Sequence, residues 1–519
     1  NENVFRVNRD DSSTFSTSGV IYDSVDAALE SAIDFKKEAS GYVQYLTGAD
    51  QADWSLRVLK NDTEAKAEDY AGFYETAYVP GDGWSTGLQL PASWTTWDLD
   101  YPIYTNTQAP WQEDSTSSDT APLAPVVYNP VGLYRKRFAL SDSVEALRQE
   151  NGRIYINFQG VESAYYVYLN GHAVGYSEDS YSPHSFDITD YLVDGENLLA
   201  VEVHKFSDST WFELQDMIKD GGIFRDVYVY GAPQVHINDY FVTTDLDETY
   251  ENADLDLTVT VDNESAQTAS GYMLDVRIYN EDGTMFVNGV TASVPAIEAG
   301  GSQTVEISKY VQDPALWSAE GPDLYYLVIS LYEEDGAYLG SMSQQLGFRE
   351  IEFTRTEVDA NGNRITEDSE YQPITINGQP LVFRGTNRHD IDPVTGKYVS
   401  HEVMVEDVTL MKQYNINAIR TSHYSNDDYL YYLCNKYGLY MMGETNLESH
   451  QLMNNAGKQQ LFKEMAMDRT VNAFHRLKNV SAIVSWSVGN ENFYSSDSNY
   501  ADGMFYDLIW YFKDNDPTR

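Results

Sequence analysis

The chain has 519 residues, more than one hydrophobic core normally holds, so about two to four domains are expected. Its 81 acidic and 33 basic residues give a formal charge of -48, which argues against nucleic acid or anionic membranes as partners and favours neutral ligands. The only cysteine, Cys434, excludes an intrachain disulfide, and its apolar neighbours predict a core position.

Residues 1–231 predict an irregular N-terminal arm followed by short β-strands. Polar and apolar residues alternate at 153–158 and 164–169, and the second segment ends at Asn170-Gly171, a strong hairpin-turn signal. Many short strands at this spacing favour a β-sandwich of the jelly-roll type.

Residues 232–347 predict a second β unit. The segments 255–261 and 276–279 alternate apolar and polar residues, and turn sequences such as 280–283 separate them. A length of about a hundred residues with this pattern favours an immunoglobulin-like sandwich.

Residues 348–519 change to a pattern in which strands alternate with helices. The strands are expected at 380–385, 418–420, 439–442 and 482–486, and the helices at 402–414, 427–436, 460–477 and 504–512. This alternation implies parallel βα units. Four units make the first half of a (β/α)8 TIM barrel, which normally needs about 250 residues.

Polar residues follow each of the four predicted parallel strands. They lie at 387–390, 420–424, 444–450 and 489–492. Taken singly, such residues are more often surface groups or hydrogen-bonded core groups. Because the catalytic groups of a parallel barrel sit at the carboxyl ends of its strands, the four sets together predict a catalytic face.

The residue types at these strand ends indicate hydrolysis at an acetal centre. The sequence has neither a G-x-S-x-G elbow nor a glycine-rich phosphate loop after a strand. Glycoside cleavage needs one protonated carboxyl group and a second carboxylate. Glu491 directly follows an apolar strand, and apolar surroundings would raise its pKa and keep a proton available. The alternative is that Glu491 only marks the start of the following helix.

The segment 486–491, Trp-Ser-Val-Gly-Asn-Glu, resembles the acid/base motif of glycoside hydrolase family 2. Segments 387–389, 422–424 and 446–450 resemble the large bacterial β-galactosidases within that family. Further upstream, segments similar to the family's sugar-binding domain occur at 101–106, 132–134, 174–177, 215–217 and 222–227. The resemblance covers essentially the whole chain, and the ordered series is more specific than any single motif.

The resemblance implies a role for each polar strand end. Glu491 would be the general acid/base, and Asn490 would bind the galactose 2-hydroxyl. Glu448 and His450, together with Glu491, would hold Mg²⁺, for which carboxylates, one imidazole and waters are reasonable ligands.

Four further residues resemble the family's substrate ligands. His389 and His423 would contact galactose and its transition state. Asp216 and Asn106, from the sugar-binding domain, would bind galactose hydroxyls, and Asp216 is also the residue expected to hold a Na⁺ ion.

The choice of substrate depends on few residues. Family β-glucuronidases usually carry Lys where Arg388 stands and lack the Glu-x-His pair, and they need cationic contacts to a substrate carboxylate. Arg388 and Arg420 are expected to support neighbouring carboxylates instead. We therefore expect a terminal β-D-galactoside such as lactose, with a β-glucuronidase-like exo-glycosidase as the alternative.

The resemblance also implies a nucleophilic glutamate near the end of the seventh barrel strand. No acidic residue downstream of Glu491 has a strand-end context. A retaining exo-β-galactosidase would then take its nucleophile from sequence beyond residue 519, because double displacement needs two carboxylates.

Three explanations stay open for this half-barrel. The chain could belong to a longer protein, a partner chain could complete the barrel, or the fragment could be a non-catalytic carbohydrate binder. A homo-oligomer is also compatible with the sequence. The acidity slightly favours a secreted bacterial protein over a cytoplasmic one.

Overall fold

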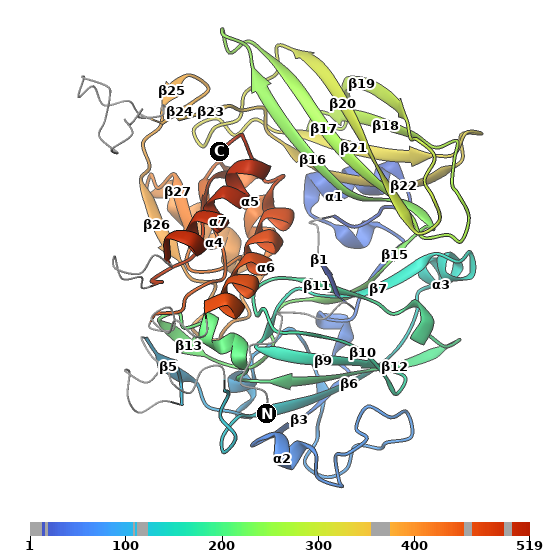
Figure 1. Ribbon diagram of the computed structural model, residues 1–519, viewed down its shortest axis with the longest axis vertical. Helices are drawn as coiled ribbons and strands as arrows, with labels where there is room; N and C mark the ends of the chain where they lie inside the picture. The colour runs from blue at the N-terminus through green and yellow to red at the C-terminus, as the bar shows by residue number, and fades with distance from the viewer. Residues whose placement is uncertain are drawn as a thin grey trace.

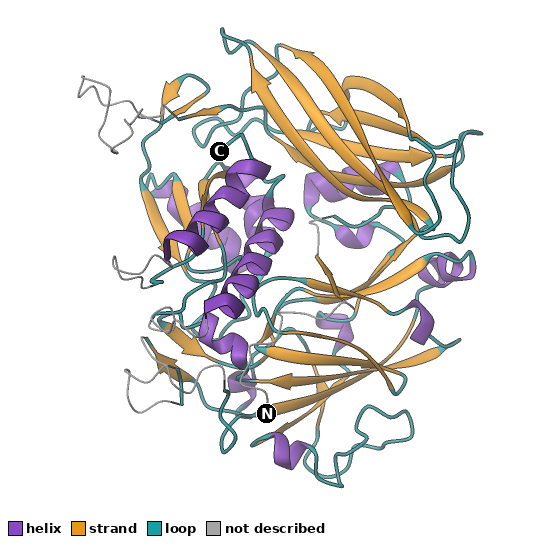
Figure 2. Ribbon diagram, in the orientation of Figure 1, coloured by secondary structure: helices purple, strands orange, loops and turns teal. Residues whose placement is uncertain are grey.

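The computed structural model describes residues 13–15, 19–106, 109–111, 123–353, 374–450, 459–492 and 501–519. Figure 1 shows two β-sandwiches and a group of helices around a small parallel sheet, and Figure 2 shows that the long helices gather on that sheet. In the described part of the chain, no helix is long and apolar enough to cross a membrane.

Two antiparallel sheets form the N-terminal sandwich. The five-stranded sheet has the order β1 (Ser13–Phe15), β11 (His184–Asp187), β7 (Arg153–Phe158), β15 (Val227–Ala232) and β2 (Val43–Tyr45). The six-stranded sheet has the order β10 (His172–Ser177), β9 (Ala164–Leu169), β12 (Glu196–His204), β6 (Val131–Ala139), β3 (Trp54–Leu59) and β4 (Ser85–Leu88). Apolar residues from both sheets share one buried core. The predicted strands β7 and β9 and the hairpin between β9 and β10 are confirmed.

Two short ladders extend from this sandwich toward the C-terminal part of the chain. They pair β5 (Ile103–Thr105) with β13 (Met217–Lys219), and β8 (Val161–Glu162) with β14 (Gly222–Ile223). The first ladder carries two of the predicted substrate ligands at its end.

The expectation of an all-β N-terminal region with an irregular arm is wrong, because its described residues include three α-helices. They are α1 (Val25–Asp34), α2 (Asp62–Ala65) and α3 (Asp142–Gln149). Ser24 caps α1 by accepting a hydrogen bond from the Ala27 amide, as N-cap serines do. The buried face of α1 consists mainly of alanines, which give a weak hydrophobic period, and it packs against β21 and β22 of the central sandwich.

The central sandwich has a three-stranded and a four-stranded antiparallel sheet around a second core. The first consists of β16 (Val235–Leu246), β17 (Asn252–Asn263) and β20 (Gly301–Gln312). The second consists of β19 (Met285–Ser293), β18 (Met273–Tyr279), β21 (Tyr325–Tyr332) and β22 (Tyr338–Leu346). The domain boundaries at residues 231 and 347 stay predictions.

The C-terminal part contains a parallel sheet in the order β26 (Gly385–Arg388), β27 (Ala418–Thr421), β28 (Tyr440–Glu444) and β29 (Ile483–Ser487). The helices are α4 (His401–Gln413), α5 (Asp428–Tyr437), α6 (Gln459–Leu477) and α7 (Ala501–Asn515). The four predicted βα units are therefore present, and within the described residues the sheet is not closed into a barrel. Cys434 on α5 is fully buried, as predicted.

The strand predicted at 380–385 is misplaced. The structure has a small antiparallel sheet of β23 (Ile351–Glu352), β24 (Thr375–Ile376) and β25 (Gln379–Pro380), and the first parallel strand begins only at Gly385. Val382 and Phe383 between these strands are exposed, so their apolar character does not mark a buried strand.

Buried ion pairs join the N-terminal sandwich to the C-terminal part. Lys397, in the segment between β26 and α4, lies 2.8 Å from Glu162 on β8, and both side chains are almost fully buried. Arg225 pairs with Asp390 at 3.1 Å across the same interface. These pairs fix the two regions relative to each other, because a small displacement would leave charges buried without their partners.

We expect Lys397→Met to lower the free energy of unfolding by about 3–5 kcal/mol, because it leaves the Glu162 carboxylate buried without its cation. The double variant Lys397→Met/Glu162→Gln should be less destabilised than the single variant. Lys66→Met, which breaks an exposed pair with Asp62, is the control and should cost less than about 1 kcal/mol. Urea unfolding measures all three, and equal losses for Lys397→Met and Lys66→Met would contradict the expectation.

Candidate active site

The ends of β28 and β29 bring four predicted site residues together. Glu448 is fully buried and accepts a hydrogen bond from Asn490 Nδ2 at 3.0 Å. Its Oε1 lies 3.1 Å from His450 Nε2, and His450 Nδ1 lies 3.6 Å from Glu491 Oε2. One ligand atom each from Glu448, His450 and Glu491 lies within 4.8 Å of the others. The cluster predicted from the sequence therefore exists as a spatial unit.

The carboxylates of this cluster make its surroundings negative, which would attract a cation. Burial works against ionisation of Glu448, yet the adjacent His450 imidazole and a hydrogen bond from Asn490 hold its pKa below the ordinary value. Burial also opposes the charge on His450, but Glu448 and the Leu214 carbonyl outweigh it and raise the His450 pKa. Glu448 Oε1 is buried without a well-directed hydrogen bond, so it is an oxygen that a cation could use.

The expectation that Glu491 has apolar surroundings is wrong, because its side chain is 58% exposed. Gly489 turns the chain away from the apolar strand with φ of 130°, and a Cβ there would lie 2.3 Å from the Leu447 carbonyl. Only glycine fits such a turn without strain. The turn places Glu491 beside His450 at the open side of the cluster.

A second buried carboxylate, Glu444 at the end of β28, lies behind the cluster. Arg420 donates to both of its oxygens, with Nη2 at 2.9 Å from Oε1, and His423 Nδ1 lies 2.9 Å from the same Oε1. Arg420 Nη2 also donates to Asn490 Oδ1 at 2.9 Å. Arg420 therefore supports neighbouring groups, as predicted, and connects Glu444 to the cluster.

The two predicted histidines lie side by side. The rings of His389 and His423 are 5.3 Å apart, nearly perpendicular. Burial, with the neighbouring His423, lowers the pKa of His389 and favours its neutral form. Arg388 is buried between Asp390 at 2.8 Å and Asp407 at 2.9 Å, so it holds carboxylates as predicted.

Asp216 and Asn106 lie at one end of the β5–β13 ladder, and both are exposed. Tyr104, which the sequence reasoning missed, donates its hydroxyl proton to Asp216. The segment before Asp216 runs along the cluster: the Leu214 amide donates to the Glu448 carbonyl at 3.0 Å. The N-terminal sandwich thus extends to the edge of the site.

Sequence reasoning also missed Glu213, which is buried between the two regions. It accepts hydrogen bonds from Arg469 Nη1 at 3.0 Å and from Asn446 Nδ2 at 2.9 Å. The available signal was a charged residue inside the apolar run 211–214. Such a residue must have a buried partner, although the sequence alone does not identify it.

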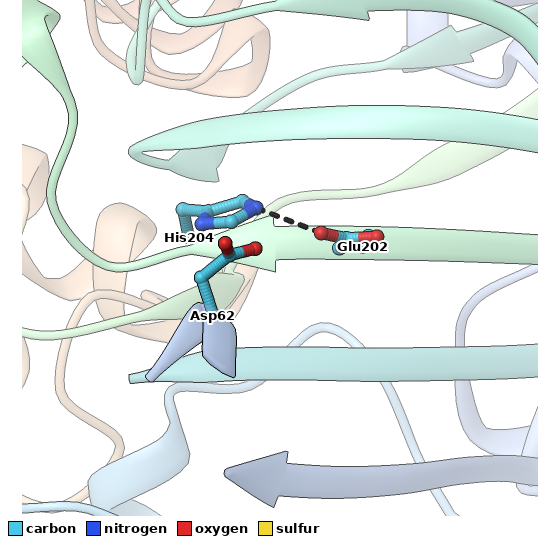
Figure 3. A group of neighbouring side chains, drawn as sticks. All are labelled: Asp62, Glu202 and His204. Atoms are coloured by element: carbon cyan, nitrogen blue, oxygen red, sulfur yellow. Dashed lines mark hydrogen bonds and ion pairs between the residues drawn. The ribbon is translucent and has the colours of Figure 1, made fainter. Parts of the chain in front are cut away.

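A separate group of ionisable residues lies on the outer face of the N-terminal sandwich. Asp62, Glu202 and His204 converge there, as Figure 3 shows. His204 Nε2 already bonds Glu202 at 2.9 Å, and Asp62 pairs with Lys66 at 2.8 Å. These contacts account for the group without a ligand.

Comparisons with known proteins match three successive parts of the chain to one family. Residues 59–233 match the sugar-binding domain of glycosyl hydrolases family 2, residues 235–349 match a second model of the same family, and residues 368–519 match its TIM barrel domain. The chain belongs to glycoside hydrolase family 2. The three matches follow one another along the chain in the order expected from the sequence.

Relatives of this family 2 chain include two β-galactosidases. That of Priestia megaterium is 37% identical over 501 residues, covering 95% of this chain and 44% of the relative. That of Clostridium acetobutylicum is 33% identical, covering 100% of this chain and 52% of the relative. The chain thus spans about half the length of these relatives.

Solved structures share the fold of the family 2 chain. A putative β-galactosidase from Bacteroides fragilis has a TM-score of 0.71 at 21% identity, covering 92% of this chain and 63% of that one. A Bacteroides uniformis β-glucuronidase has a TM-score of 0.68 at 22% identity, covering 92% and 52%.

One buried cation beside the site predicts a pH dependence of stability. Lys219 on β13 is buried and donates to the Glu213 carbonyl at 2.6 Å. Burial, followed by the charge of Lys397, lowers its pKa from 10.5 to about 8. The unfolded chain therefore holds this proton up to a higher pH than the folded chain does.

We expect the wild type to gain about 3 kcal/mol of stability relative to Lys219→Met as the pH rises from 8 to 10.5, because the folded state releases the proton first. Below pH 8 the difference should be constant. Urea unfolding of both proteins across this range measures it, and a flat difference between pH 8 and 10.5 would contradict the lowered pKa.

Proposed function

We propose that the chain supplies the acid half of a retaining exo-β-galactosidase, and that the nucleophile comes from sequence beyond residue 519. The proximity of Glu491 to Glu448 and His450 at the carboxyl ends of β28 and β29 carries the proposal. It is supported by the β-galactosidase names of the relatives. The rest of the barrel would come from the same polypeptide or from a partner chain, and a homo-oligomer is compatible with either.

In this proposal Glu491 protonates the leaving oxygen and later takes a proton from water. Its exposure gives a leaving group access to the carboxyl group. Asn490 uses one amide N–H for Glu448 and has a second for the sugar 2-hydroxyl. His389 and His423 line the same side of the site.

Asp216 and Asn106 would bind other galactose hydroxyls from the edge of the N-terminal sandwich. The carboxylate of Asp216 is held by Tyr104, and its exposure leaves room for a hydroxyl group. We also propose Asp216 as the ligand for Na⁺, a hard cation that prefers oxygen.

A neutral galactoside fits better than a glucuronide. A glucuronidase needs a cation for the substrate carboxylate, but Arg388 is buried between two aspartates and Arg420 is held by Glu444. The likeness to β-glucuronidase structures keeps a β-glucuronidase-like activity as the second candidate. A non-catalytic carbohydrate binder would not need Glu491 beside Glu448 and His450.

We propose that Glu448, His450 and Glu491 hold Mg²⁺. Their donor set has two carboxylates and one imidazole, and the buried Glu448 Oε1 lacks a well-directed hydrogen bond. His450 Nε2 lies 3.2 Å from the Leu214 carbonyl, an arrangement that orients metal-binding imidazoles. The bound ion would supply positive charge that tunes the acidity of Glu491.

The central prediction concerns hydrolysis of galactosides. The 519-residue chain alone should not hydrolyse an aryl β-galactoside, whereas a protein with the complete barrel should, because double displacement needs both carboxylates. In that complete protein, Glu491→Gln should reduce kcat/KM about 100-fold or more for an alkyl galactoside and much less for a nitrophenyl galactoside, whose leaving group needs little protonation.

Glu406→Gln, an exposed position on α4, is the matched control and should leave both rates unchanged. Steady-state assays with both galactosides and with an aryl β-glucuronide test the proposal. Turnover by the 519-residue chain, equal losses for both leaving groups, or preference for the glucuronide would each count against it.

The metal proposal can be tested on the chain itself. Calorimetric titration with Mg²⁺ or Mn²⁺ should show one binding event, and Glu448→Gln should weaken it at least about tenfold because a buried anionic ligand is lost. Glu202→Gln, in the group of Figure 3, is the control and should bind as the wild type does. Unchanged binding in Glu448→Gln would refute the assignment.

A further inference from the structure

We infer that Glu444 is a positioning residue that sets the tautomer of His423 and the orientation of the Asn490 amide. Both side chains face the sugar in the proposed function, on which the inference therefore rests. Glu444 itself would not touch substrate.

Both oxygens of the Glu444 carboxylate are engaged by neighbouring side chains. Its side chain is fully buried at the end of β28, and its amide donates to Thr421 Oγ1 at 3.2 Å. One oxygen meets both His423 Nδ1 and Arg420 Nη2, and the other meets Arg420 Nε. A carboxylate held in this way can act only through the groups that it contacts.

The first of these groups is the His423 imidazole. A carboxylate paired with a guanidinium only accepts hydrogen bonds, so Nδ1 of His423 must carry the proton in the 2.9 Å contact. In neutral His423 the other nitrogen, Nε2, then has a lone pair and accepts a hydrogen bond. Glu444 thereby makes His423 an acceptor for a sugar hydroxyl.

The second group is the Asn490 amide, which Glu444 reaches through Arg420. Arg420 is bound to Glu444 through Nε and Nη2, and Nη2 also donates to Asn490 Oδ1 at 2.9 Å. Because the amide oxygen faces a donor, Nδ2 must face Glu448, to which it donates at 3.0 Å. The remaining N–H of Asn490 is then available as a donor for the sugar.

One buried carboxylate thus determines an acceptor and a donor on neighbouring side chains. A purely structural role for Glu444, as the counter-ion of Arg420 in the parallel sheet, would stabilise the fold but would not require one tautomer of His423. The tautomer therefore distinguishes the two roles.

The experiment is ¹⁵N nuclear magnetic resonance of the 519-residue chain with labelled histidines, of which there are nine. Long-range proton–nitrogen correlations identify the protonated ring nitrogen, and His423→Gln assigns the His423 signals. We expect a single Nδ1–H tautomer in the native chain and a majority of Nε2–H in Glu444→Met. Thr445→Val, the adjacent buried position, whose hydroxyl has no partner among the described residues, should leave the tautomer unchanged.

Glu444→Met leaves the Arg420 charge without its carboxylate, so the double variant Glu444→Met/Arg420→Met provides the same test if the single variant fails to fold. An Nε2–H or mixed tautomer in the native chain would overturn the inference, and so would an Nδ1–H tautomer in the folded variants. In a protein with the complete barrel, Glu444→Met should also lower kcat/KM at least about tenfold, whereas Thr445→Val should not.

The tautomer is measured without substrate. Failure of the inference about Glu444 and failure of the proposed function are therefore separate outcomes. A native Nδ1–H tautomer in a complete protein that does not hydrolyse galactosides would reject the function alone. If the complete protein hydrolyses galactosides but Glu444→Met leaves the His423 tautomer unchanged, only the positioning role would be rejected.

Discussion

The buried carboxylate of Glu213 holds the site in place, because it joins the N-terminal sandwich to the loop after β28. Arg469 and Asn446 both donate to it from the C-terminal part of the chain. A buried carboxylate that loses its partners costs several kcal/mol, so this loop cannot move away from the sandwich without a large penalty. Glu448 and His450 follow Asn446 in the same loop, and their positions are therefore fixed by a residue from another region of the chain.

The other charged contacts of this interface serve the same purpose. Arg225 with Asp390 and Lys397 with Glu162 are buried pairs whose net stabilisation is small compared with apolar packing, because both partners lose their hydration. Their effect is directional, since Arg225 also donates to the Ser425 carbonyl and Lys397 to the Tyr181 hydroxyl, so that each cation is held by groups at fixed positions. The edge of the site that carries Asp216 is thus set by ion pairs together with apolar packing, in which Phe212 and Leu214 share a buried cluster with Leu447.

Local periodicity explains how much of this arrangement the sequence predicts. The strands at 153–158 and 164–169 and the second to fourth βα units follow from patterns within a few residues, whereas the first parallel strand was misplaced. The cluster of Glu448, His450 and Glu491 was expected from strand ends and family resemblance. The contacts of Glu213 could not be predicted, because Asn446 lies 233 residues away and only folding brings it near. Helix α1 was missed because its buried face is mostly alanine.

The three glutamates of the candidate site differ in burial. Glu444 and Glu448 are fully buried and keep their hydrogen-bond partners in one geometry, as groups that orient others require. Glu491 is 58% exposed, since Gly489 turns it out of the sheet. A group that exchanges a proton with a leaving group needs access from outside, and a group that fixes a neighbour needs none. In this chain Glu444 and Glu448 are enclosed at the strand ends, whereas Glu491 lies at the open edge of the four-stranded sheet, where the rest of a barrel would pack.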